Sequence, residues 1–160
     1  MSEYQGTFKR YEKKYLVTQK QYNALAKVFA ARMVPDRFAE STISNIYYDT
    51  PDFRLIRRSL DRPAYKEKLR LRTYRTPGAD TEAFVEIKKK YDHIVYKRRI
   101  AMTYSEAQAY LDGGAAPEQS QISREIDWFL QFYQHSAAMC ICYDRLALFD
   151  KYQRSLRVTS

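Results

Sequence analysis

The feature that most constrains the fold is the alternation of charged and apolar side chains between Tyr65 and Arg75. Successive side chains of a β-strand point to opposite faces of its sheet. One face of this segment therefore carries four successive cations, namely Lys66, Lys68, Arg70 and Arg72. The opposite face carries Leu69 and Leu71. The pattern predicts a strand of an antiparallel sheet with one buried face and one cationic face.

The same separation recurs in five other segments, over residues 8–17, 82–90, 94–102, 139–149 and 154–159. The positive charge is also concentrated in the middle of the chain. The stretch from Arg62 to Arg99 holds twelve Lys and Arg against five Asp and Glu, so that it carries +7 of the chain's net charge of +9. Because apolar and β-branched residues are interleaved with these charges, the stretch is predicted to be folded rather than a disordered basic tail.

The connections between the central strands are too short to cross over, so residues 65–102 are predicted to form an antiparallel meander. Helices are predicted over residues 19–33, after a capping box of Thr18 and Gln21, and after Ser105 with Gln108. Another helix is predicted from an apolar stripe, which comprises Ile122, Ile126, Phe129, Leu130 and Tyr133. We expect an α+β fold in one domain over residues 1–160. The sequence stops two residues after Val158, so we expect the domain to be C-terminally incomplete and to lack its last strand.

Several classes of protein are excluded. No apolar run is long enough to span a bilayer, and the polar N-terminus has no secretory signal, so a cytoplasmic location is expected. Cys140 and Cys142 cannot form a disulfide framework, are too few for a zinc site without nearby partners, and are predicted to be small buried hydrophobic residues. Four glycines make a glycine-rich phosphate loop implausible. The net charge indicates a polyanionic partner.

A cationic sheet face has two interpretations. It is either the solvated side of the sheet or a surface that binds an anion with several charges. Solvated faces normally mix signs, because like charges directly opposite one another across a sheet are destabilising. The cationic run at 66–72 contains no acid on its face, which favours anion binding. Glu12 and Glu86, on cationic faces of their own strands, either pair with neighbouring cations or hold a hard divalent ion against phosphates.

Seven motifs, in order along the chain, resemble the vacuolar transporter chaperone (VTC) domain of the triphosphate tunnel metalloenzyme (CYTH-like) superfamily. They are FKRYEKKYLV (8–17), IYYDTP (46–51), KLRLRTY (68–74), FVEIK (84–88), VYKRR (95–99), CYDR (142–145) and SLRVT (155–159). The resemblance implies an antiparallel β-tunnel lined with basic residues and flanked by helices. It also implies a polyphosphate polymerase that transfers the terminal phosphoryl group of ATP to a growing polyphosphate chain, with Mn²⁺ or Mg²⁺.

The resemblance also implies site residues. Those expected to act in catalysis are Arg70, Arg72 and Lys88. Those expected to bind phosphate are Arg10, Lys14, Lys68, Lys97, Arg145 and Arg157. The metal ligands would be Glu86 and Glu12. Hydrolytic and cyclising relatives begin the first strand with Glu-x-Glu-x-Lys, and Arg10 stands in place of the first Glu here, which favours the polymerase branch. The family's final strand, with a metal-binding Glu and a Lys, has no counterpart before Ser160.

Three alternatives stay open at this point. An inorganic triphosphatase or a non-catalytic polyphosphate sensor would use the same cationic face. A single-stranded nucleic-acid-binding module would also use basic strands, with aromatic side chains for base stacking. It is disfavoured because Tyr11, Tyr15 and Tyr96 fall opposite the cations, whereas only Tyr74 and Phe84 share their face.

Overall fold

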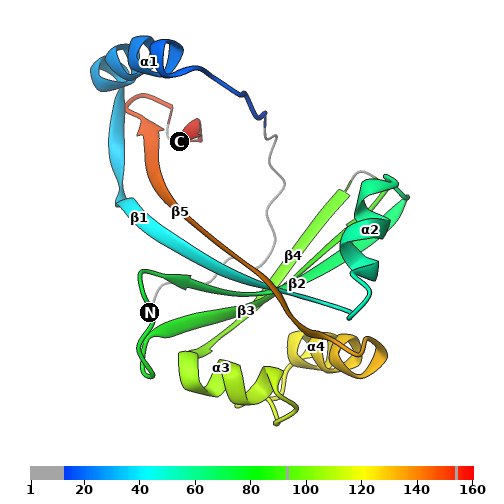
Figure 1. Ribbon diagram of the computed structural model, residues 1–160. Helices are drawn as coiled ribbons and strands as arrows, with labels where there is room; N and C mark the ends of the chain where they lie inside the picture. The colour runs from blue at the N-terminus through cyan, green and yellow to red at the C-terminus, as the bar shows by residue number, and fades with distance from the viewer. Residues whose placement is uncertain (1–12, 93, 154) are drawn as a thin grey trace. The chain divides into compact units, whose positions relative to one another are not determined.

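The computed structural model describes residues 13–92, 94–153 and 155–160. These residues form an α+β fold with four helices and a six-stranded sheet in the order β4-β3-β2-β1-β5-β6 (Figure 1). The helices are α1 (Gln19–Arg32), α2 (Arg54–Leu60), α3 (Tyr104–Leu111) and α4 (Gln121–Phe132). The strands are β1 (Met33–Asp49), β2 (Tyr65–Tyr74), β3 (Glu82–Tyr91), β4 (Ile94–Thr103), β5 (Ser136–Asp150) and β6 (Arg157–Thr159).

The chain divides into two compact units. The first unit contains Ile43–Tyr143, and the second contains the described part of Lys9–Thr42 together with Asp144–Ser160. The long strands β1 and β5 each contribute residues to both units. In the described part of the chain, no helix has both the length and the apolar character that a membrane span requires.

The first unit contains the predicted antiparallel meander. β2 pairs with β3 and β3 pairs with β4, both antiparallel, and β1 pairs with the free side of β2. Leu69 and Leu71 of β2 are fully buried and pack in one cluster with Ile126 and Phe129 of α4. Helices α3 and α4 cover this apolar face of the meander (Figure 1). The predicted stripe on α4 is thus confirmed as the helix's core-facing side.

The second unit contains α1, whose predicted start is confirmed. The Thr18 hydroxyl accepts a hydrogen bond from the backbone of Gln21, and the Gln21 side chain accepts one from the backbone of Thr18. The predicted strand over residues 8–17 is partly outside the described residues. Over residues 13–17 the prediction is wrong, because these residues have no regular structure and Leu16 is fully exposed. Alternation yields a strand only where a neighbour pairs the backbone, and no described strand pairs with residues 13–17.

Two element boundaries also differ from the predictions. Helix α3 is capped by Thr103, whose hydroxyl accepts from the backbone of Glu106, and not by Ser105. Both residues begin a capping-box pattern, but β4 ends at Thr103, and this residue takes the extended conformation that an N-cap needs. Residues 44–48, Ser-Asn-Ile-Tyr-Tyr, predict a short strand from their composition, whereas the observed strand β1 begins at Met33.

Candidate anion-binding site

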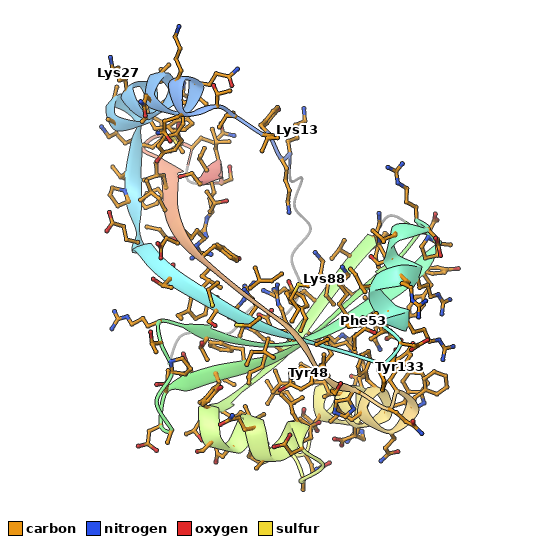
Figure 2. The ribbon with its side chains drawn as sticks, viewed as in Figure 1. Lys13, Lys27, Tyr48, Phe53, Lys88 and Tyr133 are labelled. Carbon is orange, nitrogen blue, oxygen red and sulfur yellow. The ribbon has the colours of Figure 1, made fainter. Side chains whose placement is uncertain are left out.

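The sheet register aligns the predicted cations in rows across three strands. Lys68 of β2 lies opposite Lys88 of β3, and Lys88 lies opposite Lys97 of β4. We call these three residues the lysine row. Lys88 is exposed, Lys97 keeps 41% of its side chain exposed, and Lys68 is half-buried. Figure 2 shows Lys88 on the side of the sheet away from Tyr48 and Tyr133, which belong to the helix-covered core. The cationic face is therefore the face opposite helices α3 and α4.

The neighbouring row contains a buried carboxylate surrounded by cations. Arg70 lies opposite Glu86, and Glu86 lies opposite Arg99. Glu86 is only 1% exposed although it is on the face opposite the apolar core. Its Oε2 lies 2.6 Å from both Nε and Nη2 of Arg70 and 4.0 Å from Nε of Arg72. Its Oε1 lies 3.1 Å from Nζ of Lys97 and 3.7 Å from Nη1 of Arg99.

The electrostatics of this cluster follow from its burial and its charges. Burial by itself raises the pKa of Glu86, but Arg70, then Lys97 and Arg72, hold that pKa below its ordinary value. Burial lowers the pKa of Lys97, and Arg72 and Arg70 add to that effect, while Glu86 opposes it. Burial likewise lowers the pKa of Arg99. At Arg70 burial lowers the pKa, but Glu86 and Tyr47 raise it above its ordinary value. At Lys97 and Arg99 the lowering by burial prevails, so an added anion would favour their charged forms.

Two residues of β1, Tyr47 and Asn45, orient Arg70 and Arg72, and neither was predicted from the sequence. Nη1 of Arg70 donates to the Tyr47 hydroxyl at 3.1 Å, and Nε of Arg72 donates to Oδ1 of Asn45 at 2.9 Å. Asn45 is itself held by its amide, which donates to the carbonyl of Ile141 at 3.2 Å. Asn45 and Tyr47 are two residues apart on β1 and therefore share one face of the strand. They lie opposite Arg72 and Arg70 of β2, so the face pattern of β1 together with its register on β2 could have identified them.

The other predicted site residues either lie outside the described residues or belong to the second unit. Arg10 and Glu12 lie outside the described residues. Lys14, Arg145 and Arg157 belong to the second unit. Arg157 lies 3.6 Å from Oδ2 of Asp36, whereas Nε of Arg145 is buried and has no hydrogen-bond acceptor among the described residues.

The surroundings of Glu86 do not fit a divalent cation. Both of its oxygens face cationic side chains within 4.0 Å, so a metal ion there would be repelled by up to four positive charges. Nor does any group of three or more His, Cys, Asp or Glu side chains come together as a metal site in the described ranges. Given the four cationic side chains around it, Glu86 has the geometry of a counter-ion that holds these cations in place.

Comparison with known proteins shows what this sequence and this fold resemble. No curated protein matches the sequence. The fold is similar to that of a crystal structure of a putative adenylate cyclase from Bacillus halodurans, with a TM-score of 0.58 and 15% sequence identity. The match covers 85% of this chain and 64% of the Bacillus halodurans chain, so this chain spans less than two thirds of that protein.

This likeness confirms the predicted α+β fold of the triphosphate tunnel type, with antiparallel strands and flanking helices. A sequence model described as the VTC domain matches residues 9–160, which is nearly the whole chain. The match includes all of the strands and helices described above. The chain therefore belongs to the VTC domain family.

Proposed function

We propose that the chain binds triphosphate or polyphosphate on its cationic sheet face and transfers the terminal phosphoryl group of ATP to a polyphosphate chain. The observation that carries the binding proposal is the lysine row. Three lysines stand directly opposite one another on adjacent strands, with no acidic residue in the row. Like charges in this arrangement destabilise a sheet. A linear anion lying across the strands would remove the repulsion.

The charge of the face supports a ligand with several negative charges. Together the lysine row, Arg70, Arg72 and Arg99 carry six positive charges against the one negative charge of Glu86. Charge-assisted hydrogen bonds contribute roughly 1.5–3 kcal/mol each, so several contacts to one phosphate chain would bind it firmly. The planar guanidinium group of arginine can donate two hydrogen bonds to the paired oxygens of a phosphate, and the flexible lysines add point charges.

The proposed roles follow from exposure. Lys88 and Lys97 are exposed and would contact the phosphate chain directly, while Arg70 keeps 16% of its side chain exposed beside Glu86. Arg72 is buried and would act mainly through its charge. Phosphoryl transfer needs the reacting groups held in line and the charge of the transferring group neutralised. These side chains would supply both. Lys14, Arg145 and Arg157 stay predicted phosphate ligands.

The family implies Mn²⁺ or Mg²⁺, and such an ion would neutralise phosphate charge during transfer. Because the surroundings of Glu86 do not fit a cation, Glu86 is proposed as the counter-ion of Arg70 and Lys97.

A nucleic-acid-binding role is less well supported. Phe84 is on the cationic face, but its ring is buried, contacts Tyr74 edge-on, and has the Arg99 guanidinium 4.3 Å from its centroid. A ring already covered on one side by an arginine offers little surface for base stacking. Tripolyphosphate should therefore displace an oligonucleotide from the protein easily.

The binding proposal is tested by Lys88→Ala, with Lys89→Ala as the matched control. Lys89 is the next residue of β3, but it points to the other face and pairs with Glu125 at 3.2 Å. We expect Lys88→Ala to weaken tripolyphosphate binding about tenfold or more in isothermal titration calorimetry. It should leave the ligand-free protein folded and close to the parent in stability, because Lys88 is exposed on the surface of the sheet. Equal affinities of the two variants would refute the proposal.

The transfer reaction is tested separately, by incubating the parent protein with ATP and Mn²⁺. Accumulation of polyphosphate supports the polymerase. Release of free phosphate supports a triphosphatase on the same face, and binding without turnover supports a polyphosphate sensor. In each case Lys88→Ala should reduce the amount of product formed or of ligand bound, and Lys89→Ala should not.

A further inference from the structure

Two cysteines on β5 form a close pair that the anion site does not use. Cys140 and Cys142 are exposed, contrary to the expectation that they are buried hydrophobic residues. They are two residues apart on β5 and therefore share one face of the strand. Their Sγ atoms lie 3.6 Å apart. Ser44 of β1 lies beside them, with its Oγ 3.1 Å from Sγ of Cys142 and 3.9 Å from Sγ of Cys140.

The pair is on the sheet face opposite the anion site. Ser44 precedes Asn45, which contacts Arg72, and neighbouring residues of a strand point to opposite faces. All of these residues belong to the first unit. The two thiols are therefore exposed on the other side of the sheet from the lysine row, where phosphate binding would not occupy them.

We propose that Cys140 and Cys142 form a bidentate binding site for a thiophilic divalent ion of the zinc and cadmium type. Two thiolates bound to one tetrahedral zinc ion at about 2.3 Å lie about 3.8 Å apart. The 3.6 Å separation in the free protein is already close to that spacing. Ion binding would thus need little rearrangement of the strand, and Sγ–metal bonds would form as the two thiol protons are released.

The character of the site follows from its donors. Thiolate sulfur favours soft and borderline ions over Mg²⁺ or Mn²⁺, so the site would not compete for the ion that accompanies ATP. Within the described ranges no third His, Cys, Asp or Glu joins the two cysteines, so the pair is a two-ligand chelate and not the three- or four-ligand zinc site that the cysteine count excluded. The protein therefore supplies two strong ligands, with the Ser44 hydroxyl beside them, and leaves coordination positions open to solvent.

The test uses Cd²⁺ alone as the probe on the reduced, metal-free chain. We expect one Cd²⁺ per chain, an ultraviolet thiolate-to-metal charge-transfer band, and proton release on binding. Cys140→Ser and Cys142→Ser should each weaken Cd²⁺ binding about tenfold or more and remove most of the band. Both variants should bind tripolyphosphate like the parent, which shows that they are folded and separates this site from the anion site.

Three results would overturn the proposal. One is a parent chain that does not bind Cd²⁺. Another is a single-cysteine variant that binds it as tightly as the parent. The third is a stoichiometry of one ion per two chains, which would place each ion between cysteines of different molecules. Ser44→Ala should keep the stoichiometry at one ion per chain, because the two thiolates remain.

Discussion

Replacing Glu86 with glutamine keeps the shape of the side chain and removes its charge. Four cationic groups then lose the carboxylate that lies within 4.0 Å of them. Removing one partner of a buried ion pair typically costs about 3–5 kcal/mol. The largest share should come from Arg70 and Arg72, which keep only 16% and 9% of their side chains exposed, whereas Lys97 is more exposed. For a chain of this length, a loss of this size lowers the melting temperature by roughly 6–20 °C.

The assay is thermal unfolding of the parent and of Glu86→Gln, with and without tripolyphosphate. The anion should raise the melting temperature of the variant more than that of the parent, because the variant's cations have no internal counter-ion. Glu125→Gln is the matched control. Glu125 pairs with Lys89 and Arg98 on the other face and is more exposed than Glu86, so its loss should cost at most about 1 kcal/mol.

The effect should depend on pH in a defined direction. Because the pKa of Glu86 is held below its ordinary value, the charged cluster stabilises the parent fully above the ordinary carboxyl pKa. That contribution is lost as the pH falls through the lowered pKa, so the gap between parent and Glu86→Gln should close in acid. The counter-ion role is refuted if Glu86→Gln is as stable as the parent at neutral pH and loses only metal-dependent binding.

Three further outcomes are expected. Tyr47→Phe removes the acceptor of Arg70 and should weaken tripolyphosphate binding several-fold with little change in melting temperature, measured by calorimetry; a variant with parental affinity would show that Tyr47 does not orient Arg70. Tripolyphosphate affinity should fall as the pH rises through the lowered pKa of Lys97, because the side chain loses its charge. Lys97→Arg should move that fall in affinity to higher pH. An affinity of the parent that does not change over the alkaline pH range would contradict this. Thr103→Ala should lower the free energy of unfolding by about 1 kcal/mol in urea titrations, whereas Ser105→Ala should not, because Thr103 caps α3.

Much of the first unit could be predicted from local patterns. The alternation in β2 to β4 and their short connections are local properties, and they fixed both the antiparallel order and the cationic face. The register of β3 on β4 could also be derived, since only two residues separate Tyr91 from its partner Ile94. The register of β2 on β3 could not, because the connection from Tyr74 to Glu82 is longer and allows several pairings.

The amino-acid sequence alone determined which side chains share a face, because side-chain direction along a strand depends only on parity. Tertiary structure decided which of them meet. Lys68, Lys88 and Lys97 form a row, and Glu86 lies among cations, only because three strands pair in one register out of several. The same holds for the exposure of Cys140 and Cys142 and for the irregular backbone of residues 13–17. Burial and pairing depend on what neighbouring elements cover, and no local pattern encodes that.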